Sequence, residues 1–242
     1  MTTVITYGLI SVVPLIFGAW LGTVLKIKEK YVGVISAFGA GALIAALTFG
    51  LMEEAFSLGG LDHSVLGFLA GGIVFAIGDL IILKIGGRGH KDTYDSNDTT
   101  GWGIVLGAVL DGLPESIALG IGLFLNPKMG LLLLLAIIFS NLPEAIASAY
   151  DLRRIHKSAK KIIITWSFVA LLTFIMVILG YVLFGHMSSS VAALLESFAA
   201  GAIMAMLAVT MMPEAYKESG VGASLATVFG FLIIFALSRA GV

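Results

Sequence analysis

The chain has 242 residues, of which 59% are apolar and only 12% are charged, and its formal net charge is −1. With a mean hydropathy of +1.06, this composition excludes an ordinary water-soluble domain and indicates an integral membrane protein. There is no cysteine, which excludes disulfides and thiolate metal ligands and leaves oxygen and imidazole as metal donors.

Apolar runs long enough to cross a hydrocarbon core of ~30 Å recur along the chain. They predict one transmembrane domain over 1–242 with eight helices, at about 4–25, 32–54, 64–85, 102–125, 129–150, 161–184, 190–214 and 221–240. The first run lacks the basic start and the cleavage site of a signal peptide, so we expect a retained helix. The expected fold class is an all-α, polytopic membrane protein.

The one polar segment between these runs is 86–101, which contains His90 and several aspartates. Its composition predicts a cytoplasmic loop. A weak metal site at His90 is the alternative interpretation, and a solvated linker is the one we favour.

Lysine and arginine are divided unequally between the two sides of the membrane. The loops after the first, third, fifth and seventh expected helices hold twelve of the fourteen basic residues, and the other side holds Lys128 and Arg239. The positive-inside rule therefore predicts both termini outside the cytoplasm, in a plasma or inner cell membrane. Because the basic residues follow this topological pattern, we expect the lipid bilayer, and no nucleic acid, as a partner.

The second and seventh expected helices resemble each other. Phe38–Phe56 aligns without a gap with Phe198–Tyr216, and both segments end in Met-x-Glu-Ala-aromatic. Chance recurrence of small residues is the alternative, which the shared ending weakens. Because the two helices are expected to run in opposite directions, the repeat is inverted, and the plan becomes three helices, a central pair and three helices. Inverted repeats are typical of secondary transporters.

The two central runs each contain a proline followed at once by a glutamate, Pro114-Glu115 and Pro143-Glu144. A carboxylate at the bilayer centre costs roughly 2.5–3.5 kcal/mol on insertion scales, so such residues mark ion or proton pathways. Each proline also frees the carbonyl four residues before it. The alternative is a simple kink beside a protonated glutamate, and the duplicated motif favours function.

Polar side chains stand beside each proline at helical spacing. Asp111 lies four residues before Glu115, Ser140 lies four residues before Glu144, and Asn141 is adjacent. If the two helices face each other, three carboxylates converge, and they repel unless they are protonated or hold a cation. Such oxygen-rich ligation suits hard divalent ions such as Mg, Ca and Mn, although carboxylates also bind Zn and Fe.

At these residues the chain resembles the ZIP (Zrt/Irt-like protein) family of divalent-metal transporters, over essentially its whole length. That family has eight helices, both termini outside, a 3+2+3 inverted-repeat plan, and a central site built from an HNxPEG-type and an HxxPE-type motif. The resemblance implies transport of a divalent metal of the Zn, Mn or Fe class as substrate into the cytoplasm, without a prosthetic group, and, as a family expectation only, a homodimer. It also implies that Asp111, Glu115 and Glu144 are metal ligands, with Ser140 and Asn141 as weaker ligands or supporting groups.

The chain departs from the family pattern at its histidines. Asp111 and Gly112 stand where the fourth-helix motif has His and Asn, and Ser140 stands where the fifth-helix motif has His. The sixth helix offers only hydroxyls, so a second metal position is expected to be weakened or lost. Replacing imidazole by carboxylate and hydroxyl predicts a shift toward harder ions, Mn or Fe(II) over Zn.

Further acidic residues lie at the ends of the repeated helices. Glu53 and Glu54 are expected at the outer entrance, and Glu214 and Glu218 at the cytoplasmic exit, although carboxylates at helix ends are usually just solvated. Asp79 lies inside the third run, where a structural hydrogen bond is the favoured role.

Functions other than transport receive less support. Gly78-Asp79 and Tyr150-Asp151 raise an intramembrane aspartyl protease, but their order is wrong for that resemblance, and no His-Glu-x-x-His motif for a metalloprotease exists. We therefore expect no enzyme. A non-transporting metal-binding relative and a passive cation channel are the remaining alternatives.

Overall fold

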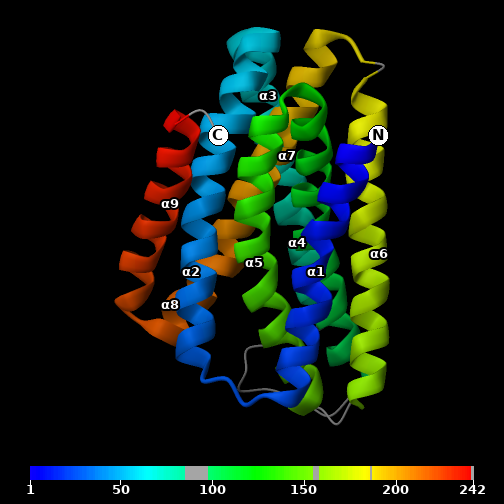
Figure 1. Ribbon diagram of the computed structural model, residues 1–242, viewed down its shortest axis with the longest axis vertical. Coiled ribbons are helices and arrows are strands. Elements are labelled where there is room, and N and C mark those ends of the chain that lie inside the picture. Colours follow the sequence, from blue (N-terminus) through cyan, green and yellow to red (C-terminus); the bar gives the residue numbers. More distant parts are fainter. Residues whose placement is uncertain (85–97, 155–157, 186, 241–242) are drawn as a thin grey trace.

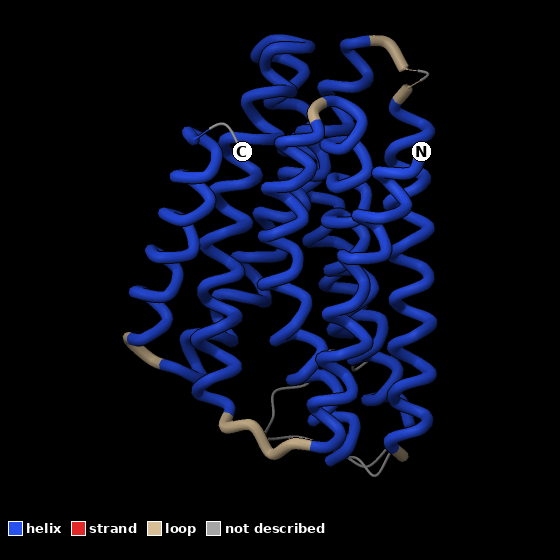
Figure 2. Tube along the Cα trace, in the orientation of Figure 1, coloured by secondary structure: helices blue, strands red, loops and turns tan. Residues whose placement is uncertain are grey.

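The protein is described by a computed structural model covering residues 1–84, 98–154, 158–185 and 187–240, with the side chains of 98–102 left aside. The expected loop 86–101 falls almost entirely outside these ranges, and so does the alternative metal site at His90. Throughout the described ranges the secondary structure is helical (Figures 1 and 2).

The helices follow one another with short connections. In chain order they are α1 (Thr2–Val24), α2 (Glu29–Ala46), the π-helical η1 (Leu47–Met52), α3 (Glu53–Lys84), α4 (Asp98–Leu125), α5 (Pro127–Arg154), α6 (Ala159–Phe184), α7 (Ser189–Met206), the π-helical η2 (Leu207–Met211), α8 (Met212–Ser219) and α9 (Gly222–Ala240).

Seven helical stretches in the described part of the chain are long and apolar enough to cross a membrane. The expectation of an all-helical, polytopic membrane protein is confirmed at this level. Large apolar side chains such as Leu61, Leu66 and Phe168 are exposed on the outer faces of the bundle, as is normal where lipid replaces water. The core lies instead where α2, α4, α5 and α7 meet.

One of the seven stretches, 29–84, contains 56 residues. A straight helix of that length would extend roughly 84 Å, far beyond a hydrocarbon core of ~30 Å. Gly60 interrupts it with φ 70° and ψ −172°, a conformation that essentially only glycine adopts. In Figure 1, α2 rises toward the end of the bundle that holds both termini, and α3 begins with a turn there.

The two helices that align in sequence also share a local irregularity. In both, the α-helical hydrogen-bond pattern gives way to a π-helix at equivalent residues, Leu47 and Leu207. Short π-helical segments occur often at functional sites. The likeness between these helices therefore extends from residue types to backbone conformation.

Glycines allow the repeated helices to pack at backbone distance. A Cβ added at Gly41 would overlap the carbonyl of Thr227 on α9, and one at Gly201 would overlap the carbonyl of Phe68 on α3. Gly41 and Gly201 are equivalent positions of the aligned segments. The α2–α9 and α3–α7 pairs thus use the same close approach, which small residues make possible in membrane helices.

Candidate metal site

A cavity of about 460 Å³, a volume that includes space open to solvent, lies between α2, α4, α5, η2 and α8, at the end of the bundle opposite the two termini. The charge asymmetry predicts this end to be cytoplasmic. Four carboxylates line the cavity: Asp111, Glu144, Glu214 and Glu218. Two of them, Asp111 and Glu144, come from the Pro-Glu helices, and the other two come from α8, Glu214 within the repeated segment and Glu218 just after it.

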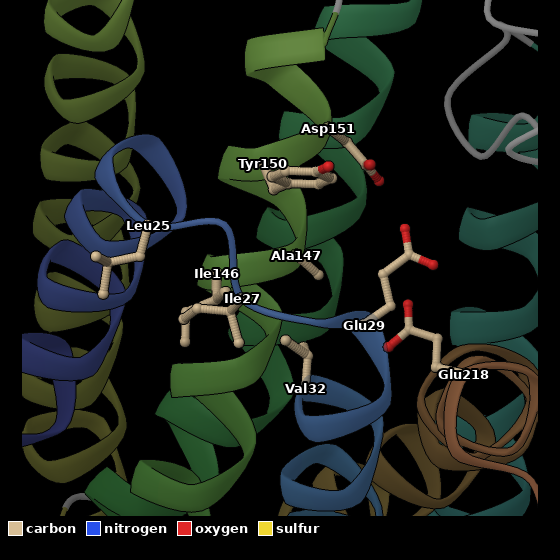
Figure 3. Close-up of a pocket in the computed structure, with 9 residues that line it drawn as sticks. All are labelled: Leu25, Ile27, Glu29, Val32, Ile146, Ala147, Tyr150, Asp151 and Glu218. Atoms are coloured by element: carbon tan, nitrogen blue, oxygen red, sulfur yellow. The ribbon is translucent and has the colours of Figure 1, made fainter.

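A second cavity of about 330 Å³ adjoins the first, since both are lined by Val32, Ala147 and Glu218. It adds the carboxylates of Glu29 and Asp151. Figure 3 shows the side chains of Glu29, Asp151 and Glu218 gathered along one wall of this cavity. Acidic side chains therefore extend from the Pro-Glu helices to the expected cytoplasmic surface.

Glu115 lies deeper than the cavity wall, with 2% of its surface exposed. The hydroxyl oxygen of Ser140 lies 3.2 Å from both of its carboxylate oxygens, so this hydroxyl can donate to either one. This contact joins α4 to α5 at the level of the two prolines. The two Pro-Glu helices therefore meet at Glu115 and Ser140.

Asn141 points toward a different helix. It is buried, and its side-chain amide donates to the carbonyl of Ser11 on α1 at 3.5 Å. On the opposite side of α5, Gly39 of α2 packs against the carbonyl of Phe139, which is freed by Pro143. A Cβ at Gly39 would lie 2.6 Å from that oxygen. Both contacts fix α5 between its neighbours at the Pro-Glu motif.

The predicted ligands are thus divided between two environments. Asp111 and Glu144 line the cavity, whereas Glu115 and Ser140 are hydrogen-bonded to each other behind it. Asp111 is close enough to Glu115 for their charges to interact. No three acidic or histidine side chains among the described residues are arranged to hold one metal ion. It therefore stays a prediction that a cation is held jointly by Asp111, Glu115 and Glu144.

The expected entrance residues lie at the opposite end of the bundle. Glu53 is exposed and forms an ion pair of 3.5 Å with the likewise exposed Arg239. Glu54 is half-buried, and Asp79 is buried inside α3. On α6, the hydroxyl of Thr173 lies within hydrogen-bond distance of the Val169 and Ala170 carbonyls of its own helix.

One acidic residue was overlooked in reasoning from the sequence. Glu196 lies on α7 with 0% of its surface exposed, and neither carboxylate oxygen has a hydrogen-bond partner among the described residues. The sequence did contain a signal for it, since a glutamate inside an expected membrane span, here 190–214, is itself unusual. It lacks the proline that drew attention to the other two glutamates.

Comparison with known proteins gives two matches. A family model described as ZIP zinc transporter matches residues 84–238, a range that contains both Pro-Glu motifs. An Arabidopsis thaliana protein named "Putative zinc transporter At3g08650" is 27% identical over 209 residues, covering 84% of this chain and 33% of the relative. The chain thus spans about a third of that relative's length.

Proposed function

The chain belongs to the ZIP zinc transporter family, and on this premise we propose that it is a secondary transporter for divalent cations of the Zn, Mn or Fe class. Transport runs from outside the cell across the plasma or inner membrane into the cytoplasm. The observation that carries this proposal is the acidic cavity beside the two Pro-Glu helices, lined by Asp111 and Glu144.

The proposed architecture has eight membrane spans in a 3+2+3 inverted repeat. The reversal at Gly60 supports it by dividing the 56-residue stretch into two spans. The matching π-helices at Leu47 and Leu207 and the equivalent glycine contacts of Gly41 and Gly201 support the repeat. With an even number of spans, both termini lie on the same side, in accord with Figure 1.

In the proposed mechanism the cation loses water at Asp111, Glu115 and Glu144. In the conformation described here, Glu115 is held by Ser140 while Asp111 and Glu144 face the cavity. Rotation of the Ser140 hydroxyl frees a carboxylate oxygen of Glu115 and turns the hydroxyl oxygen toward the ion. Because the acidic cavity opens toward the expected cytoplasmic end, the described conformation corresponds to release of the ion inward.

The proposed preference is for harder ions than the family's histidine-rich sites favour. Carboxylate and hydroxyl oxygens suit Mn and Fe(II), whereas imidazole suits Zn well. Asp111 and Ser140 supply such oxygens at positions where the family motifs have histidine. Uptake of Zn with no detectable uptake of Mn would overturn this part of the proposal.

The test is cation uptake by purified protein in liposomes, with Zn, Mn, Fe(II), Co, Cd, Mg and Ca compared. A carrier shows saturable uptake, a passive channel shows uptake without saturation, and a metal-binding protein shows none. Glu115→Gln and Glu144→Gln remove a charge with little change of shape and are expected to abolish most of the uptake. Asp62→Asn, an exposed residue of α3, is the matched control. Uptake insensitive to both glutamine variants would exclude this site.

A further inference from the structure

Glu196 is the buried acidic group that the proposed cytoplasmic path does not use. It lies in α7 with no exposed surface, and both of its carboxylate oxygens lack a hydrogen-bond partner among the described residues. Such a group in a membrane protein interior is costly unless a proton or a cation accompanies it. Its presence therefore points to a function that requires the carboxylate.

A second carboxylate lies beside it. Leu58, one turn after Glu54 on the first segment of α3, packs against a buried cluster that contains Ala192, one turn before Glu196 on α7. Residues 53–59 still run toward the end of the bundle that holds the termini, before the chain reverses at Gly60, whereas α7 starts at that end. Each glutamate therefore lies one turn deeper than the level at which Leu58 and Ala192 share this cluster. In accord with this placement, the charges of Glu54 and Glu196 interact.

The internal repeat relates this pair to the cytoplasmic cavity. In the alignment of the second and seventh helices, Glu54 is equivalent to Glu214. Extending that alignment by two residues makes Ser36 equivalent to Glu196. Ser36 and Glu214 both line the 460 Å³ cavity. Glu54 and Glu196 thus occupy, in the outer half, the positions that line an open cavity in the inner half.

The outer half is closed in this structure. The cavity wall in the inner half includes Met206, Met211 and Ala215. The equivalent residues of the outer half, Ala46, Leu51 and Ala55, are fully or almost fully buried. An outward-facing conformation that exchanges the roles of the two halves would open the surface on which Glu54 and Glu196 lie.

We propose that Glu54 and Glu196 form a second divalent-cation site in the outer half of the protein, which receives the ion before it reaches Glu115 and Glu144. This inference rests on the transport function proposed above. A divalent cation shared by the two carboxylates removes their mutual repulsion and supplies the missing partners of Glu196. Two carboxylates and water are ligands typical of hard divalent ions.

The first test measures Zn²⁺ uptake by purified protein in liposomes over a range of external concentrations. Glu196→Gln and Glu54→Gln are expected to raise the KM for Zn²⁺ about tenfold or more, since the loss of a ligand or of its support costs at least that much in metal affinity. The maximal rate is expected to stay within about twofold, because binding rather than translocation is affected. Glu196→Asp, which keeps the carboxylate, is expected to restore most of the affinity.

Asp62→Asn is the matched control, because it removes one exposed negative charge at the same end of the protein. A KM for Glu196→Gln equal to that of this control, in well-folded protein, would overturn the inference while leaving the transport function intact. Absence of saturable uptake of Zn²⁺, Mn²⁺ and Fe²⁺ alike by the wild type would instead overturn the transport function. Monodisperse elution in detergent establishes that each variant is folded.

The second test uses the absence of cysteine from the chain. Ala55→Cys places a single thiol at the position equivalent to the cavity-lining Ala215. We expect a membrane-impermeant maleimide added outside to label this thiol slowly, as the outer half opens. A buried thiol that is never labelled from outside during active transport would contradict an outer site that opens to the ion.

Discussion

Gly39 offers a direct test of how closely the helices must pack at the Pro-Glu motif. In Gly39→Ala the new Cβ would lie 2.6 Å from the carbonyl oxygen of Phe139 and 2.9 Å from the backbone nitrogen of Ser140. A carbon and a carbonyl oxygen in ordinary contact are about 3.3 Å apart. The α2 and α5 backbones must therefore separate by roughly 0.7 Å, because no flexible side chain can yield instead.

The expected energetic result has two opposing parts. Alanine in place of glycine within a helix is favourable by about 1 kcal/mol, whereas overpacking against backbone costs about 1–3 kcal/mol. Gly72→Ala is the matched control, since its Cβ would meet its nearest atom, a carbonyl oxygen of Gly201, at 3.6 Å. Both variants gain the same helix propensity, so this contribution cancels in the comparison. We therefore expect Gly39→Ala to be less stable than Gly72→Ala by the cost of overpacking, about 1–3 kcal/mol.

The measurements are the thermal unfolding of purified protein in detergent and metal uptake in liposomes. Each kcal/mol corresponds to roughly 2–4 °C in Tm for a chain of this size. Any part of the backbone separation that α5 takes up displaces Ser140 from its 3.2 Å contact with Glu115, so uptake should fall as well. Equal Tm and equal uptake for the two alanine variants would refute the packing argument.

Three further predictions concern the turn, the surface and the metal. Gly60→Ala is expected to destabilise the protein by about 1–3 kcal/mol, because alanine is strained at φ 70°, although nothing lies within 4 Å of the added Cβ. An unchanged Tm would contradict this strain. Glu53→Gln removes the exposed ion pair with Arg239 and should change the unfolding free energy by no more than about 1 kcal/mol; a larger loss would mean that the pair is not merely at the surface. Asp111→His introduces an imidazole at the cavity wall and should raise the ratio of Zn to Mn uptake, so a ratio that falls would refute the role given to Asp111.

The sequence by itself determined the class of the protein, the family resemblance and the importance of the Pro-Glu motifs. Apolar length and helical spacing are local properties, so they identify spans and show that Asp111 and Glu115 share a helix face. The same is true of the aligned segments Phe38–Phe56 and Phe198–Tyr216, whose likeness lies in the order of their residue types. The residues next to Glu196 in the sequence, however, did not mark it as a candidate, because it lies in an apolar run without a proline.

Only the tertiary structure decided which of these side chains meet. Contacts between helices depend on how closely backbones approach at glycines such as Gly39, and spacing along one helix carries no information about its neighbour. Packing placed Glu115 against Ser140, turned Asn141 toward Ser11 of α1, and left Glu144 on a cavity wall. The separation of the acidic residues into an open cavity at one end of the bundle and a closed region at the end that holds the termini is a property of that packing.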